Sequence, residues 1–318
     1  MKKRLMACGR GVLFVAIAAA LFLGASHVFS PKNNQKEFGM ADPAAHGVLG
    51  ERKDSIDAVF LGDSEASTTF SPLQIWEEQG FTSYTCATNG QKLCYTRTLL
   101  QQALREQCPR VVVLETNAIY TSLTPSDALA QAASDALPVF QYHDRWKSLR
   151  LDDVTRPITC TWTDDFKGSY ANGQVNAANA ARHMAPTDNV ATIPSLNALY
   201  LQDIAHYCES HGAKLILVST PSTVNWNQAR HNGIAKFAEE QGVTYLDLNV
   251  APIKLDIDWN VDTRDKGDHL NVHGAAKVSS FIGSYLKEVF TLSDHRKDTD
   301  YAAWNESLAR HKKHLAEI

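Results

Sequence analysis

Two short segments, far apart in the chain, carry side chains that together suit a catalytic serine site. The first is Gly62-Asp63-Ser64, which follows an apolar and β-branched run at 56–61. This pattern predicts a strand that ends in a tight turn, with Asp63 and Ser64 at the start of a helix. A serine there would lie at the C-terminal edge of a sheet, where open α/β folds bind ligands. An isolated Gly-Asp-Ser more often only caps a helix.

The second segment, residues 262–274, precedes the last predicted helix and contains Asp265, Asp268 and His269. A serine nucleophile needs a base, a group that orients the base, and donors for the oxyanion. Ser64 fits the nucleophile, His269 fits the base, and either aspartate fits the group that orients the base. We favour Asp265, because adjacent side chains rarely turn to face one another, and we keep Asp268 open.

Two more loops follow predicted strands and should share the edge that carries Ser64. Asn89-Gly90 follows the second strand, and Glu115-Thr116-Asn117 follows the third. The N–H groups of Ser64 and Gly90, together with the Asn117 side-chain amide, are the candidate oxyanion donors.

In chain order, Gly62-Asp63-Ser64, Gly90, Asn117 and His269-Leu-Asn-x-x-Gly274 resemble the four sequence blocks of the SGNH (GDSL-like) hydrolase superfamily. The resemblance covers roughly residues 56–120 and 213–290. It implies a nucleophilic Ser64, oxyanion donors Gly90 and Asn117, a basic His269 and no cofactor. Gly-Asp-Ser-Glu, the N-terminal apolar segment and Gly-Asp-His-Leu-Asn also resemble the D-alanyl transfer proteins of teichoic acid and related cell-envelope proteins.

Two departures from the family pattern motivate a second hypothesis. The third block reads Glu115-Thr116-Asn117-Ala118 where the family has Gly-x-Asn-Asp, and Lys266 stands where the family places its acid. A non-catalytic envelope protein of the same fold, binding a glycan or an assembly partner, is therefore the alternative.

The block at 262–274 is also rich enough in acids and imidazoles to suggest a metal site. Gly274 and the turn-like residues 265–268 indicate a helix that begins only near His273, so His269 and His273 would not share a helix face. We predict no metal and assign His273 to an exposed helix start. The metal hypothesis rests on Asp262, Asp265, Asp268, His269 and His273.

Strands and helices alternate along most of the chain. Strands are predicted at 56–62, 82–87, 111–115, 213–219 and 243–248, with helices between them and a last helix at 273–290. This order predicts a three-layer α/β/α sandwich with a parallel sheet, of the SGNH or flavodoxin-like type. We place the domain at 55–292, with an inserted region at about 120–192, a polar linker at 31–54 and a charged helical tail at 293–318.

The N-terminus combines basic residues with an uncharged apolar run from Gly11 to Ser30. The run is just long enough to span a membrane, and the basic residues before it favour an inside N-terminus. We therefore predict that residues 1–30 form a cytoplasmic tip and an uncleaved single-pass signal anchor, with the catalytic domain outside the cell membrane. A cleaved signal peptide is the competing interpretation.

The charge composition of the chain argues against one class of partner, nucleic acid. A formal net charge of -4 offers no basic surface for nucleic acid. We expect a serine esterase, or an O-acyltransferase or deacylase, that acts on an acylated envelope polymer or glycan through an acyl-serine intermediate. A membrane-bound acyl-transfer protein is a further expected partner.

Overall fold

The computed structural model describes residues 2–318, with side chains described from Cys8 onward. The chain forms two compact units, which we describe separately. The N-terminal unit runs from the N-terminus to Ala41 and includes Pro125–Thr161, and the sheet unit comprises Asp42–Thr124 and Trp162–Ile318.

The sheet unit is built on five parallel strands, all near the predicted positions. They are β1 (Ala58–Gly62), β2 (Ser83–Ala87), β3 (Val111–Glu115), β4 (Lys214–Ser219) and β5 (Thr244–Asp247). Their order across the sheet is β2-β1-β3-β4-β5. The chain therefore turns one way after β1 and the other way from β3 onward. Ligands in such folds bind at this switch, at the carboxyl ends of the strands.

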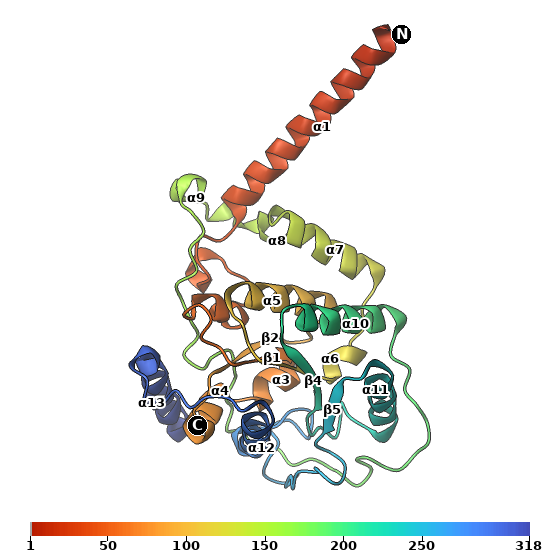
Figure 1. The fold of residues 1–318 in the computed structure, drawn as a ribbon, viewed down its shortest axis with the longest axis vertical. Helices are drawn as coiled ribbons and strands as arrows, with labels where there is room; N and C mark the ends of the chain where they lie inside the picture. The colour runs from red at the N-terminus through yellow and green to blue at the C-terminus, as the bar shows by residue number, and fades with distance from the viewer. Residues whose placement is uncertain (1) are drawn as a thin grey trace. The chain divides into compact units, whose positions relative to one another are not determined.

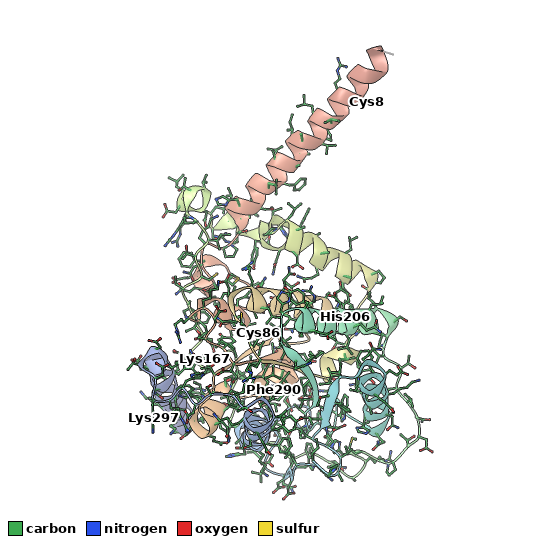
Figure 2. The ribbon with its side chains drawn as sticks, in the orientation of Figure 1. Cys8, Cys86, Lys167, His206, Phe290 and Lys297 are labelled. Carbon is green, nitrogen blue, oxygen red and sulfur yellow. The ribbon has the colours of Figure 1, made fainter. Side chains whose placement is uncertain are left out.

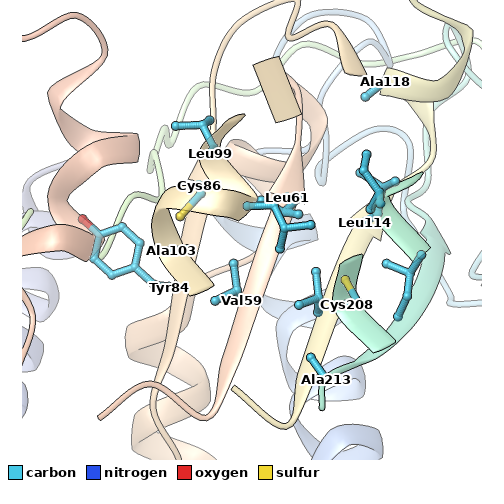
Figure 3. Close-up of a cluster of buried hydrophobic side chains, with 14 of the residues drawn as sticks. Val59, Leu61, Tyr84, Cys86, Leu99, Ala103, Leu114, Ala118, Cys208 and Ala213 are labelled. Atoms are coloured by element: carbon cyan, nitrogen blue, oxygen red, sulfur yellow. The ribbon is translucent and has the colours of Figure 1, made fainter. Parts of the chain in front are cut away.

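Alternate residues of each strand enter cores on opposite faces of the sheet. Val59 and Leu61 pack in one core with α5 (Leu93–Glu106) and α10 (Ser195–Ser210), as Figures 1 and 3 show. Ala58 and Phe60 pack in the other with α12 (Val272–Phe290). Since both faces are covered, the strands β1, β3 and β4 read as nearly continuous apolar runs. The predicted three-layer α/β/α sandwich with a parallel sheet is confirmed.

Further elements complete the two units. The sheet unit also contains α2 (Pro43–His46), η2 (Gly47–Gly50), α3 (Ser64–Thr69), α4 (Pro72–Gln79), α6 (Asn117–Tyr120), α11 (Gln228–Gln241), η4 (Thr299–Tyr301) and α13 (Ala302–Glu317). The N-terminal unit contains α1 (Lys2–Phe29), η1 (Lys36–Phe38), α7 (Pro125–Ala136), α8 (Val139–Tyr142), η3 (His143–Lys147) and α9 (Asp152–Thr155).

The N-terminal helix α1 contains one segment, Cys8–Phe29, that is long and apolar enough to cross a membrane. Its side chains are mostly exposed, and Figure 2 shows Cys8 towards the N-terminal end of this helix. The side chains of Lys2, Lys3 and Arg4, on which the predicted orientation depends, lie outside the described residues.

The predicted linker at 31–54 contains folded and buried parts. Lys32 is buried in the N-terminal unit, and residues 43–50 form α2 and η2. Ala45 and Val48 are buried in the core of the sheet unit. These few apolar residues hold the segment in place, although most of its residues are polar.

The predicted insertion and tail both have more order than their sequences suggest. Of the insertion at 120–192, Pro125–Thr161 belongs to the N-terminal unit, and the remainder from Trp162 belongs to the sheet unit. The tail forms η4 and α13, and the buried Trp304 packs on Trp76 of α4 with ring centroids 5.4 Å apart. One face of the tail is aromatic and docked, and its charged side chains lie outside. This explains the mixed composition of the tail.

Gly62 is required where β1 turns into α3. Its φ is +150°, and an added Cβ would lie 2.7 Å from the Ala66 Cβ and 2.8 Å from the Glu115 Cβ. Such contacts force backbone movement, and L side chains rarely adopt this φ.

We expect Gly62→Ala to destabilise the sheet unit by about 2–4 kcal/mol, combining backbone strain and overpacking. Thermal unfolding of the full chain in detergent measures this effect. Gly212→Ala is the matched control, because Gly212 also has a positive φ but an added Cβ there meets no atom within 4 Å. Equal melting temperatures for the two variants would contradict the steric argument.

Candidate active site

Ser64 begins α3 directly after β1, at the switch point of the sheet. The preceding Asp63 caps the helix, since its Oδ1 accepts a hydrogen bond from the Glu65 N–H at 3.0 Å. Ser64 is only partly buried, whereas Asp63 and Glu65 on either side are buried. The local structure therefore leaves the serine hydroxyl accessible on an otherwise closed helix start.

His269 joins Ser64 to an aspartate. Its Nε2 lies 2.8 Å from the Ser64 Oγ, and its Nδ1 lies 2.7 Å from the Asp265 Oδ2. The other Asp265 oxygen accepts the His269 backbone N–H at 2.6 Å. With Nδ1–H donated to the carboxylate, Nε2 is the unprotonated nitrogen and accepts the serine hydroxyl. A serine, an imidazole and a carboxylate arranged in this way can activate a serine hydroxyl.

A tight loop lets Asp265 reach a histidine four residues later. Lys266 and Gly267 both have positive φ, 65° and 93°, so the chain reverses between the two side chains. Thr263 closes the loop, because its Oγ1 donates to the His269 carbonyl at 3.0 Å and accepts the Gly267 N–H at 2.8 Å. The loop thus brings the Asp265 carboxylate to the His269 ring, four residues later in the chain.

Asp268 lies near the same imidazole but farther away. Its Oδ2 is 3.6 Å from the His269 Nδ1, too long for a hydrogen bond. Its other oxygen accepts from the Asn225 side-chain amide, which also donates to Glu65 at 2.8 Å. The geometry therefore favours Asp265 as the orienting acid and gives Asp268 a place in a neighbouring polar network.

The Asn117 side chain is held in one orientation by two charged groups. Its Nδ2 donates to the Asp63 Oδ2 at 2.8 Å, and its Oδ1 accepts from the Arg230 Nη1 at 3.0 Å. Arginine only donates, so the atom facing Arg230 must be the oxygen. The amide nitrogen carries two hydrogens and Asp63 takes one. The second hydrogen remains for the predicted oxyanion role, which stays a prediction.

Gly90 lies three residues beyond the end of β2, at the edge that carries Ser64. It is exposed, its φ is +60°, and an added Cβ would meet no atom within 4 Å. Within the described residues no contact joins it to Ser64 or His269, so its oxyanion role also stays a prediction.

Three buried carboxyls surround the serine, and desolvation raises the pKa of each. Burial is the largest cause for Asp63 and for Glu65, whose pKa lies well above its usual value. Burial, followed by the nearby Asp63 charge, raises the pKa of Glu115 to about 8. Glu115 accepts the Asn117 N–H at 2.8 Å and the Thr220 hydroxyl at 3.2 Å. A protonated Glu115 thus supports the start of α6 without an uncompensated charge.

Stability is expected to fall as pH rises because of these acids. The native state keeps the Glu115 proton up to about pH 8, whereas an ordinary glutamate loses it near 4.5. Since the unfolded chain then binds fewer protons, the stabilisation is complete below about pH 4.5 and is lost up to about pH 8. Melting temperatures of the wild type should decrease across this window, and those of Glu115→Gln should decrease less. Parallel curves for the two proteins would contradict this assignment.

Sequence patterns alone did not identify Glu65, Glu115, Asn225 or Arg230 as parts of the site. An acid in the first turn of a helix is usually a solvated favourable charge, so Glu65 gave no signal of burial. Asn225 and Arg230 come from a loop and helix after β4, and only the order of strands in the sheet brings them beside Asn117 and Glu65.

The five residues on which the metal hypothesis rests do not gather as one cluster. Asp262 is buried beside the Lys277 ammonium at 2.6 Å, and His273 is exposed in the first turn of α12. Ligand atoms of Glu65, Asp268 and His269 do lie within 4.8 Å of one another in the described part of the chain. His269 already uses both ring nitrogens for Ser64 and Asp265. A metal there would therefore compete with the serine arrangement.

Comparisons with known proteins give similarities of architecture. The sequence matches no family model and no curated protein. Among solved structures, a lipase/acylhydrolase from Enterococcus faecalis shares 12% identity, covers 75% of this chain and 98% of its own, and has a TM-score of 0.40. A GDSL-like lipase from Bacteroides thetaiotaomicron shares 10% identity, with 80% and 94% covered and a TM-score of 0.37. An acetyl xylan esterase from Butyrivibrio proteoclasticus shares 10% identity, with 74% and 64% covered and a TM-score of 0.35.

Proposed function

We propose that this chain is an SGNH-type serine enzyme that hydrolyses or transfers the acyl group of an ester. One observation carries the proposal: the Ser64 Oγ, His269 and Asp265 form a continuous chain of contacts of 2.8 and 2.7 Å. The order of the four sequence blocks supports it independently. A nucleophilic serine hydroxyl at neutral pH needs a serine, an imidazole and a carboxylate in contact in this order.

The proposed reaction has two halves. In the first, the Ser64 Oγ attacks the ester carbonyl carbon while the His269 Nε2 takes the serine proton. The oxyanion is stabilised by the Ser64 N–H, with Gly90 and Asn117 as further donors. The imidazolium then protonates the departing alkoxide, leaving an acyl-Ser64 ester. In the second half, His269 deprotonates a water or an acceptor hydroxyl, which attacks the acyl group and releases Ser64.

The proposed substrate is an acylated cell-envelope glycopolymer. Support comes from the N-terminal segment Cys8–Phe29, which is long and apolar enough to span a membrane. The basic residues before it favour an outward-facing catalytic domain. The resemblance to D-alanyl transfer proteins gives the same class of substrate. An anchored enzyme also suits a large or membrane-bound substrate better than a diffusible one.

The test of this function uses the full chain purified in detergent. p-Nitrophenyl acetate should be hydrolysed, and intact mass after acid quenching should show one acetyl group on the protein. Release of acetate from acetylated glycan, compared with release of alanine from alanylated teichoic acid, then identifies the acyl group. Activity should persist in EDTA. Loss of activity in EDTA would support the metal hypothesis, and a folded but inert protein would support the glycan-binding alternative.

A further inference from the structure

The N-terminal unit carries an unusual number of exposed apolar side chains on short elements beside α1. Leu151 is 90% exposed and Trp146 is 63% exposed, in segments where a water-soluble surface would be polar. Soluble proteins rarely gather such side chains without a partner to cover them. The exposed large apolar residues of segment 139–158, which contains α8, η3 and α9, are Phe140, Trp146, Leu151, Val154 and Ile158.

These elements are fastened to the C-terminal end of α1. The Arg145 guanidinium donates to the Phe29 carbonyl at 2.6 Å and pairs with the buried Asp153 at 2.9 Å. The Lys32 ammonium donates to the His27 carbonyl. The last carbonyls of a helix have no partners within it and favour cations, so these contacts satisfy the helix end. Figure 1 shows α8 and α9 on either side of this end.

One aromatic contact gives the depth of α8 along α1. The rings of Phe140 and Phe22 lie 5.7 Å apart. Phe22 precedes Phe29 by seven residues, about 10 Å along the helix axis. The apolar segment Cys8–Phe29 has 22 residues and is about 33 Å long, close to the ~30 Å thickness of a bilayer's hydrocarbon core. If α1 spans the membrane with Phe29 at the boundary of that core, Phe22 lies about 10 Å inside it, and Phe140 beside Phe22 reaches into the acyl chains.

We propose that residues 139–158 form an interfacial collar around the exit of α1, with a phospholipid bilayer as its partner. The collar places its apolar side chains at the boundary between headgroups and acyl chains, as interfacial helices do. Trp146 suits this depth because its ring is apolar and its N–H is polar. Lys147, Arg150 and Arg156 are exposed among the apolar residues and can reach lipid phosphates. The buried ion pair between Arg145 and Asp153 holds the collar together, so it can fold without a large apolar core of its own.

Photo-crosslinking to lipid in full-chain proteoliposomes of phosphatidylcholine and phosphatidylglycerol tests the collar. A benzophenone amino acid replaces one residue at a time, and mass spectrometry detects lipid adducts. Phe140 and Leu151 are the test positions. Leu13 in α1 is the positive control, and Leu199 of the sheet unit is the matched exposed control, because it is 62% exposed and also a leucine.

We expect lipid adducts at 13, 140 and 151, each several-fold more abundant than at 199. Adducts at 13 with none at 140 or 151 would overturn the proposal, because α1 would then cross the bilayer without the collar touching it. No adduct at 13, or equal adducts at 151 and 199, would overturn it too. None of these outcomes depends on esterase activity, so the collar and the proposed function succeed or fail separately.

Discussion

Replacing Ser64 by alanine is expected to reduce ester turnover by about 10⁴-fold or more, the range found when a catalytic serine is removed. The reason is the single contact between the Ser64 Oγ and the His269 Nε2, since no other hydroxyl is in hydrogen-bond contact with that nitrogen among the described residues. The measurement is kcat/KM for p-nitrophenyl acetate, with acetyl-enzyme followed by intact mass. Ser64 is a partly exposed helix-start residue, so the melting temperature should change little.

Ser67→Ala is the matched control for that variant. Ser67 lies on the same helix and donates its hydroxyl to the Ser64 carbonyl at 3.2 Å, but it does not contact His269. Its loss should leave kcat/KM within about tenfold, as for a weak hydrogen bond. If Ser64→Ala keeps wild-type turnover, or if both variants lose activity equally, Ser64 is not the nucleophile.

Asp265→Asn is expected to give the second largest loss, about 10³–10⁴-fold in kcat. An asparagine can present its N–H₂ group to the His269 Nδ1, which then becomes the acceptor and leaves the proton on Nε2. That nitrogen can no longer accept the Ser64 hydroxyl. The same substitution at Asp268, whose Oδ2 lies 3.6 Å from Nδ1, should cost less than about tenfold because it leaves the tautomer unchanged.

The pair of aspartate variants separates two assignments that the sequence left open. Measuring kcat and KM for Asp265→Asn and Asp268→Asn side by side makes each the control for the other. The reverse ranking would assign the orienting role to Asp268. Equal losses would mean that His269 uses the two carboxylates together.

The sheet was predictable because its strands are buried on both faces. Val111-Val112-Val113-Leu114 gives an unbroken apolar run, and the Gly80 and Gly242 helix ends mark the boundaries of α4 and α11. The predicted strands therefore match the observed ones to within two residues. The order within the predicted linker at 31–54 was not predictable, because it depends on tertiary burial of a few apolar residues that composition does not reveal.

The proximity of Ser64, Asp265 and His269 could be anticipated from the sequence, and their individual contacts less so. The parallel strands bring Ser64 and Asn117 to one edge of the sheet, and the block at 262–274 carries His269. The loop reversal at Lys266-Gly267, which lets Asp265 reach His269, depends on positive φ values at both positions. A lysine gives no sequence signal for that conformation, so spacing alone could not decide between the two aspartates.

The burial of the acids around the site could not be predicted from the sequence. Glu65 is 1% exposed, and its Oε2 has no hydrogen-bond partner among the described residues. Burial, followed by the nearby Glu115 charge, raises the pKa of this carboxyl well above its usual value. Its other oxygen accepts from the Asn225 side-chain amide at 2.8 Å, so the carboxyl is paired on one side only.

Reaction with a fluorophosphonate probe tests the central claim most directly, because the probe labels only an activated serine. The full chain in detergent, its Ser64→Ala variant and its His269→Ala variant should be treated in parallel, with intact mass and peptide mapping. We predict one adduct on the wild type, located on Ser64, and none on either variant. No adduct on folded wild-type protein, or an adduct on a different serine, would contradict the account.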